Sequence, residues 1–490
     1  MPLILGTNSI KDTGYDVANS CRFNDNDSAS MSRTTETPTN VDKYTFSVWI
    51  KRGNLGISNC KIFSIGSGTY GEEKLELKSD DLLWRRTEDD AGETDYERQT
   101  DRKFRDPSAW MHIFIAYDSS DGTAGDRMKM YINGVQETSF SGSINPDSNE
   151  NALLNTASKT LYIGRYKGSD IQHYDGYMAE LAFVDGVDHA VTDFGEFDSD
   201  SPTIWKPKDI SSGITWGNNG FYLDFEDSSA LGNDVSGNNN DFTVANLAAT
   251  DQASDSPTNN FCTMNSLANK VTSVTFSEGN LKTDFANGRG GSSSTFGLTT
   301  GKWYVEKNIT TMPQDERFHL GVVPFEIQDA DDMINTNNQG IGISGFNAVI
   351  YADSGSGSAV LDNFFGNNTT RFDSWTGIIG MALDLTSGSE TIAFSKDGAW
   401  VTGSGTTDTD FSNATKLDIS TPLARHDVWH IACGTGNSTG TSGVFSMNFG
   451  SPPFSISSGN SDGNNLGNFE YAVPSGYYAL CTKNLAEFGG

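Results

Sequence analysis

The chain has 490 residues, more than one ordinary hydrophobic core holds, which favours two domains. Hydrophobic residues make up 36% and aromatic residues 11%, and 52 residues are Gly, a composition typical of a globular, turn-rich β protein. Lys and Arg total 33 against 64 Asp and Glu, and the resulting net charge of −31 disfavours nucleic acid and anionic membrane surfaces as partners.

The first residues, MPLILGTNSIKD, contain too few consecutive apolar residues for a secretory signal or a membrane span. The five cysteines are odd in number and widely spaced, without a CxxC pair. We therefore expect them to be small buried residues, and expect neither a disulfide framework nor a zinc site.

Short alternating segments fill the first 190 residues. Apolar residues share one face in YTFSVWIKRG and in WMHIFIAYD, as expected for strands with one buried side. MKMYINGVQ places Met128, Met130 and Ile132 on one side and then reaches Asn133-Gly134, a pair that tolerates the positive φ of a type I′ hairpin. ETIAFSKDGAW repeats this pattern at Asp397-Gly398.

The order of the segments from SCRFNDNDSASMSRT through YTFSVWIKRG, WMHIFIAYDSSDG, MKMYINGVQ and LYIGRYKG to YDGYMAELAFVDGV resembles the laminin G-like, concanavalin A-like jelly roll. The resemblance implies an antiparallel two-sheet sandwich over residues 1–190, of a kind often used to bind carbohydrate or protein ligands. Residues 191–264, rich in Pro, Gly, Asn and Asp, are expected to form an ordered connector with short strands.

Strand patterns resume in the last part of the chain, residues 265–490. GIIGMALDL is apolar on both faces near its start, which suits a central strand. IGMALDL, IAFSKDGAW and FSMNFG together resemble the SPRY domain, a bent antiparallel sandwich. The predicted fold is therefore all-β, with two antiparallel β-sandwich domains joined by a connector.

Candidate catalytic groups are few. GEFDSD presents alternating carboxylates at Glu196, Asp198 and Asp200, but it lies beside Ser201-Pro202, so we expect solvated loop acids and no catalytic pair. His426 and His430 are four residues apart in an extended pattern, and no HExxH motif occurs. We expect no enzyme activity and no cofactor, although a structural calcium ion stays open at the acidic loops Asp118/Asp121/Asp126 and Asp329/Asp331/Asp332.

Exposed aromatic residues beside hydrogen-bonding side chains would mark a ligand site. In GRYKGSDIQHYDGY the candidates are Tyr166, Asp170, His173 and Tyr174, with part of Tyr174 expected to serve the core. In the second domain the resemblance to SPRY domains implies a loop-rich edge with Tyr351, Arg371 and Trp375.

The segments GFYLDFEDSSALGNDVSGNNNDFTV and FEYAVPSGYYALCTKNL resemble structural proteins of marine bacteriophages. This resemblance implies a non-enzymatic virion protein, a tail fibre or adhesin, that is assembled in the host cytoplasm as a trimer or other homo-oligomer. Its implied partners are other virion proteins and a host-surface glycan or protein, without membrane insertion. A capsid decoration or fibre-anchoring protein and a polysaccharide depolymerase are the alternatives.

Overall fold

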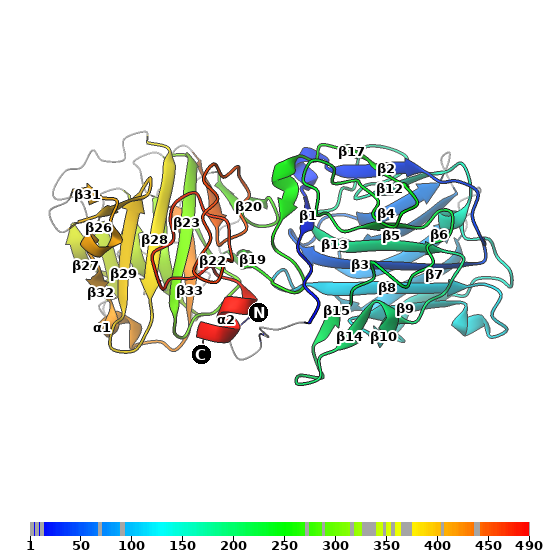
Figure 1. Ribbon diagram of the computed structural model, residues 1–490, viewed down its shortest axis with the longest axis horizontal. Coiled ribbons are helices and arrows are strands. Elements are labelled where there is room, and N and C mark those ends of the chain that lie inside the picture. The colour runs from blue at the N-terminus through cyan, green and yellow to red at the C-terminus, as the bar shows by residue number, and fades with distance from the viewer. Residues whose placement is uncertain are drawn as a thin grey trace. The chain divides into compact units, whose positions relative to one another are not determined.

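The computed structural model describes residues 4, 9, 14–66, 71–88, 94–269, 274–286, 290–313, 318–325, 340–345, 349–353, 358–363, 375–402, 406–435 and 442–489. The chain is almost entirely β, in antiparallel sheets, as predicted (Figure 1). It divides into two compact units, Thr13–Asn259 and Asn260–Gly490, the latter joined by Met1–Asp12. We call them the first and the second sandwich.

One sheet of the first sandwich, the β3 sheet, contains the long strands of the predicted alternating segments. Its order is β10 (Val135–Gln136), β9 (Met128–Ile132), β8 (Met111–Asp118), β3 (Lys43–Arg52), β13 (Gly176–Asp185), β1 (Ser20–Phe23) and β18 (Gln252–Ala253), and β16 (Phe221–Leu223) also pairs with β13.

The facing sheet, the β5 sheet, has the order β11 (Phe140–Ile144), β7 (Thr94–Lys103), β6 (Leu82–Glu88), β5 (Glu72–Leu77), β4 (Cys60–Gly66), β12 (Thr160–Ile163), β2 (Ser30–Thr34) and β17 (Thr243–Ala245). The core lies between the two sheets, where the rings of Phe46 and Phe63 are 4.8 Å apart. The period-two pattern therefore buries one side of each strand.

The core of the first sandwich also contains charge. Arg85 and Glu73 are fully buried, pair with each other, and both contact the hydroxyl of Tyr44. The backbone N–H of Leu154 donates to the other Glu73 oxygen at 2.6 Å. A buried ion pair of this kind holds a fold only when its remaining polar atoms find partners, as they largely do here.

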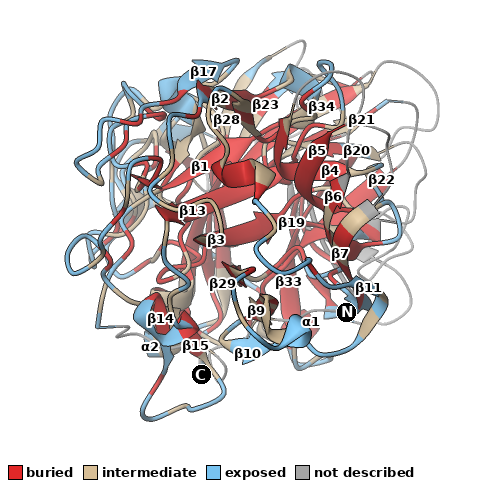
Figure 2. Ribbon diagram, turned by 90° about the vertical axis from the view of Figure 1, so that its right-hand side faces the viewer, coloured by how far each residue is buried: buried red, intermediate tan, exposed pale blue. Residues whose placement is uncertain are grey.

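Residues 191–259 do not form a separate connector but belong to the first sandwich. They supply β16, β17 and β18 to its two sheets and the small hairpin of β14 (Gly195–Phe197) and β15 (Trp205–Pro207). Their aromatic residues also cover the outer side of the β3 sheet, where Trp205 and Trp216 join Trp49 and Phe114 in a second apolar cluster. Strands β1, β3 and β13 are consequently buried on both sides (Figure 2).

The second sandwich also has two antiparallel sheets. The first has the order β19 (Met264–Asn269), β22 (Gly290–Ser294), β33 (Trp429–Thr435), β24 (Phe318–Pro324), β25 (Ile341–Ser344), β26 (Val349–Asp353) and β27 (Ser358–Asn363). The second has the order β20 (Val274–Ser277), β21 (Lys282–Phe285), β34 (Gly443–Asn448), β23 (Lys302–Thr311), β28 (Gly377–Asp384), β29 (Thr391–Lys396), β30 (Ala399–Val401) and β31 (Thr407–Asp408), with β32 (Leu417–Asp418) beside β29.

Strand β28 carries the GIIGMALD segment and lies between β23 and β29, which confirms the prediction of a central strand. The described α-helices are short, α1 (Ser420–Leu423) and α2 (Thr482–Phe488). All five cysteines are buried, as predicted, and no disulfide joins them in the structure. In the described part of the chain, no helix is both long and apolar enough to cross a membrane.

The two hairpin turns have the predicted geometry. Asn133 and Gly134 have φ angles of 49° and 74°, and Asp397 and Gly398 have 48° and 77°. Both turns connect directly paired strand ends, β9 to β10 and β29 to β30. Positive φ at both central residues is the signature of a type I′ turn.

Candidate functional site

The predicted ligand residues of the first sandwich lie in the loop between β12 and β13. Tyr166 is half-buried, Asp170 is exposed and His173 is 6% exposed. Asp170 Oδ1 lies 3.0 Å from Arg165 Nη1 and 3.2 Å from His173 Nε2. The structure therefore brings Asp170 and His173 together and adds Arg165, which the sequence did not indicate.

Tyr174 does not belong to this group, because its ring is fully buried. It packs edge-on against Phe23 with 6.1 Å between ring centroids, and its hydroxyl donates to the carbonyls of Lys51 and Tyr177. It lies two residues before β13 and belongs to the core cluster, so the whole side chain serves the core.

Of the residues expected at the edge of the second sandwich, Arg371 and the side chain of Tyr351 lie outside the described residues. Trp375 is described: its Nε1 donates to Asp397 Oδ2 at 3.2 Å, and the ammonium of Lys396 lies 4.6 Å from its ring. Trp375 therefore contacts the β29–β30 hairpin.

The acidic segments have internal partners. Glu196 is exposed, but Asp198 is largely buried, which corrects the expectation of a solvated acid. Asp198 Oδ1 accepts from the N–H groups of Asp200 and Ser201, and Lys206 Nζ lies 3.3 Å from Asp198 Oδ2. These contacts hold the β14–β15 hairpin.

Asp118 Oδ2 accepts from Lys43 Nζ at 2.6 Å, and Asp121 Oδ1 accepts from the N–H of Thr123. The residues Asp329, Asp331 and Asp332 lie outside the described part of the chain. The residues that the structure describes contain no group of three or more His, Cys, Asp or Glu placed to hold a metal ion.

The side of the β5 sheet that faces away from the core carries a second set of polar and aromatic residues. Leu75, Leu77 and Leu83 point into the core, so Lys74, Glu76 and Trp84 point away from it. Register places Trp84 beside Glu76 on one side and Gln99 on the other. We call this surface, with the neighbouring loop after β12, the outer face.

Three aromatic rings on the outer face lie beside cationic side chains. Lys74, Lys78 and Arg86 lie 4.7 to 5.0 Å from the ring of Trp84, whose Nε1 donates to Glu97 Oε2 at 3.0 Å. Lys61 and Lys167 lie 5.6 and 5.9 Å from the ring of Tyr166. Arg165 lies 4.7 Å from the ring of Tyr162. Cation–π contacts hold these rings in fixed orientations.

Two acid–base pairs lie among these rings. Lys61 pairs with Glu76 and Lys74 pairs with Glu72, all with little exposure. Burial lowers the pKa of the Lys61 ammonium although Glu76 is beside it. The second carboxylate oxygens, Glu72 Oε1 and Glu76 Oε1, are buried and accept no hydrogen bond from the residues that the structure describes. An unmet buried acceptor costs free energy, which a donor that reached it would recover.

The outer face was missed in the sequence because its residues occupy the polar positions of alternating strands, which normally face water. A signal was available: twelve of the 33 Lys and Arg residues fall within residues 43–105 of a strongly acidic chain.

Comparison with known proteins identifies the first sandwich. Residues 24–188 match the model of the concanavalin A-like lectin/glucanases superfamily, and this part of the chain has the laminin G-like, concanavalin A-like jelly-roll fold. No match is found among curated proteins.

Several solved structures are similar to parts of the chain. A heptameric SAP-like pentraxin from Limulus polyphemus is 17% identical, covering 35% of this chain and 77% of its own, with a TM-score of 0.25. Domains LG4-5 of the mouse laminin alpha1 chain are 10% identical, covering 96% and 90%, with a TM-score of 0.29. The SPRY domain of human HERC1 is 14% identical, covering 34% and 87%, with a TM-score of 0.23.

Proposed function

We propose that the first sandwich is a non-catalytic glycan-binding module and that the outer face is its binding surface. The observation that carries the proposal is the pair of buried carboxylates, Glu72 and Glu76, each with one oxygen that has no donor among the described residues, beside the rings of Trp84 and Tyr166. Sugars present hydroxyl donors around an apolar face of C–H groups, and sugar sites combine acceptors with aromatic side chains in this way.

The surrounding lysines and arginines support the same role. Lys61 and Lys74 are already paired with Glu76 and Glu72, and other cations lie against the rings, while Trp84 Nε1 donates to Glu97, so the surface is rigid before a ligand arrives. A preformed site loses little conformational entropy on binding. Catalysis is not proposed, because Glu72 and Glu76 are each held by a lysine as ion pairs.

The test is a glycan array probed with the full chain, followed by calorimetric titration of the strongest ligand. Trp84→Leu and Tyr166→Leu should each weaken binding at least tenfold, because each removes a flat ring while keeping an apolar side chain. Trp375→Leu, in the second sandwich, is the matched control and should leave the affinity unchanged. Unchanged affinity in the Trp84→Leu/Tyr166→Leu double variant, with a wild-type thermal melt, would contradict the proposal.

We further propose that binding needs no cofactor, so that treatment with EDTA leaves the affinity unchanged. A loss of binding that calcium restores would instead place an ion at the acidic loops.

We propose that the module acts in a bacteriophage virion as a tail fibre or adhesin and that the chain assembles as a homo-oligomer, a trimer being favoured. The support is the resemblance of residues 220–244 and of the closing segment FEYAVPSGYYALCTKNL to phage structural proteins. Light scattering of the purified chain tests the oligomer, and antibody labelling of particles in electron microscopy tests its place. Labelling of the head instead of the tail would favour the alternative of capsid decoration.

A further inference from the structure

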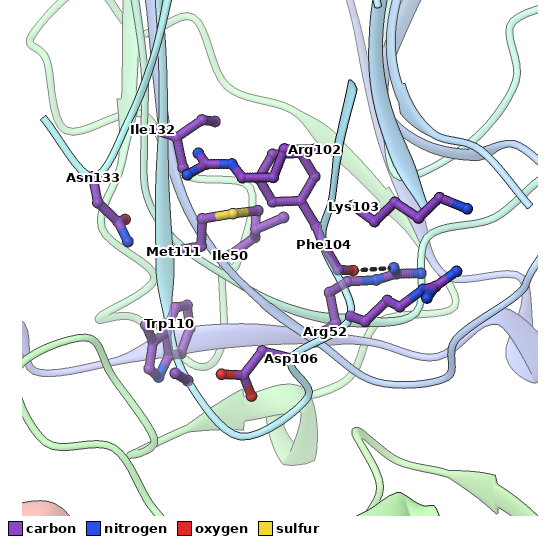
Figure 3. A pocket seen from close by; sticks show the side chains of 12 residues that line it. Ile50, Arg52, Arg102, Lys103, Phe104, Asp106, Trp110, Met111, Ile132 and Asn133 are labelled. Atoms are coloured by element: carbon purple, nitrogen blue, oxygen red, sulfur yellow. Dashed lines mark hydrogen bonds between the residues drawn. The ribbon is translucent and has the colours of Figure 1, made fainter. Parts of the chain in front are cut away.

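A separate pocket lies at one end of the first sandwich, where strands from both sheets meet. It has a volume of about 220 Å³ and is formed by the ends of β3, β7 and β9, the start of β8 and the loop between β7 and β8. The side chains of Ile50, Phe104, Trp110, Met111 and Ile132 give it an apolar wall (Figure 3). This volume is below the range of about 300–1,000 Å³ usual for drug-sized ligands, so the pocket suits one small ring.

The charged residues of this pocket have the opposite balance to the chain as a whole. Arg52, Arg102, Lys103 and Arg105 line it with a single carboxylate, Asp106, although the chain carries −31. Arg52 is buried and donates to Asp81 Oδ1 and to the carbonyl of Phe104, so it fixes the wall and is not available to a ligand. Arg105 also pairs with this carboxylate, its Nε lying 3.0 Å from Asp81 Oδ2.

Arg102 is the cation best placed for a ligand. Its side chain is 52% exposed and its guanidinium lies 5.0 Å from the ring of Phe104, reaching across it toward Ile132 (Figure 3). Within the described structure its charged contact is Glu137 Oε2, 3.4 Å from Nε. The two terminal nitrogens have no hydrogen-bond partner among the described residues, and a pair of parallel donors matches the geometry of a carboxylate.

Asn133, the first residue of the hairpin turn, lies on the opposite wall (Figure 3). Its Oδ1 accepts from the N–H of His112 at 2.8 Å, which fixes the orientation of the amide. The Nδ2 group is therefore left as a donor at the pocket. Asp106 adds an acceptor, since Ser108 engages its Oδ1 and not its Oδ2.

From this arrangement we infer that the pocket binds a single acidic sugar residue, a pyranose ring that carries one carboxylate. The carboxylate contacts the terminal nitrogens of Arg102, Asn133 Nδ2 donates to a ring substituent, and Asp106 accepts from a sugar hydroxyl. The C–H face of the ring lies against the apolar wall. The outer face is not part of this pocket, so the inference does not depend on the function proposed above.

The test uses the full chain and four probes measured by saturation-transfer NMR and calorimetry: glucuronate, N-acetylneuraminate, glucose and acetate. At least one of the two sugar acids should bind at least tenfold more tightly than glucose and acetate, because both the charge and the ring are needed. Binding should weaken as salt rises. Equal binding of acetate would reduce the pocket to a plain anion site, and equal binding of glucose would remove the role of Arg102; either result overturns the inference.

Three variants that each lower the net charge by one unit separate the pocket from general electrostatics. Arg102→Gln and Asn133→Asp should each weaken binding of the sugar acid at least tenfold. Asp keeps both the turn and the acceptor for His112 N–H, as Asp397 shows in the equivalent turn, but replaces the donor with a carboxylate. Lys129→Gln, on β9 outside the pocket, is the control and should have no effect.

Thermal melts of each variant show whether it is folded, and Trp84→Leu distinguishes the two surfaces. If Trp84→Leu abolishes sugar-acid binding while Arg102→Gln leaves it intact, the acid binds at the outer face and the inference is wrong. Retained binding in folded Asn133→Asp would likewise remove the assigned role of Asn133.

Discussion

The β9–β10 and β29–β30 hairpins are built alike in two different sandwiches. In each, the first turn residue pairs with a residue on the neighbouring strand through both its backbone and its side chain: Asn133 with His112, and Asp397 with Ile378. In each, a Cβ on the turn glycine would lie 2.3 Å from an aromatic ring supplied by a later segment, Trp205 for Gly134 and Tyr471 for Gly398.

The surroundings of the two turns nevertheless differ. His112 lies between Trp49 and Trp205, receives Trp205 Nε1–H on Nδ1 at 3.0 Å and contacts Ser47 Oγ through Nε2. Trp205 is 7% exposed, whereas Tyr471 is only half-buried. The register of the paired strands requires this turn in both sandwiches. In the second sandwich the turn forms without a network like the one around His112, so that network is an addition specific to the first sandwich.

The largest expected difference between the two sandwiches is the loss of stability at low pH. Burial lowers the pKa of His112 to about 3, so the folded state holds it neutral while the unfolded state takes up a proton below about 6.5. Stability from this group is present above pH 6.5 and is lost as the pH falls toward 3, by about 1.4 kcal/mol per unit and at most about 5 kcal/mol. His430, with its pKa lowered to about 4 by burial, gives the second sandwich a smaller loss.

Urea titrations read by hydrogen exchange in each sandwich of the full chain measure this. His112→Gln should flatten the pH dependence of the first sandwich between pH 6.5 and 3 and leave that of the second unchanged. An identical slope in wild type and variant would show that His112 is not held neutral.

Gly134→Val should destabilise the first sandwich by about 3 kcal/mol. Positive φ costs a β-branched residue about 1–2 kcal/mol, and displacement of the buried Trp205 ring adds about 1–3 kcal/mol of overpacking. Hydrogen exchange of β8 and β9 peptides in the full chain reports the change. A cost below about 1 kcal/mol would mean that the ring moves freely.

Gly398→Val should cost the second sandwich less, about 2 kcal/mol. The φ penalty is the same, but the half-exposed Tyr471 can turn into solvent. Exchange of β28 and β29 peptides provides the measurement, and a cost equal to that of Gly134→Val would remove the distinction between the two rings.

The smallest effects come from exchanging the turn residues. Asn133→Asp should change stability by no more than about 0.5 kcal/mol, since Oδ1 still accepts from His112 N–H. Asp397→Asn should destabilise the second sandwich by about 1 kcal/mol, because the amide N–H₂ then replaces the oxygen that accepts from Trp375 Nε1–H. Equal costs, measured by urea midpoints, would indicate that Trp375 does not depend on Asp397.

The sequence predicted the strands and turns whose conformation depends on neighbouring residues along the chain. Alternation identified β3, β8 and β9, and Asn133-Gly134 and Asp397-Gly398 specified both turns, because these properties follow from local backbone preference. Contacts between distant segments were not visible. Trp205 on Gly134, and Glu76 beside Trp84, depend on which strands pair and in what register.

The same limit explains the misplaced boundary after residue 190. A segment rich in Pro, Gly and Asn reads as a connector, yet Phe221–Leu223 and Gln252–Ala253 pair with β13 and β1. Their strands are too short for a periodic pattern, and tertiary contacts decide their conformation. Tyr174 was only partly predicted to serve the core for a related reason, since a buried and an exposed tyrosine look alike in a loop.

The chain enters and leaves the first sandwich at adjacent points. The N–H of Val17 donates to Thr258 Oγ1 at 2.9 Å, and Ser20 pairs with Ala253, while Ile4 bridges to Phe296 within the second sandwich. The first sandwich is thus an insertion within the sequence of the second, with its two ends side by side. Because its two ends are adjacent, Thr13–Asn259 could be exchanged for another domain with adjacent ends while the second sandwich keeps its own strands and core.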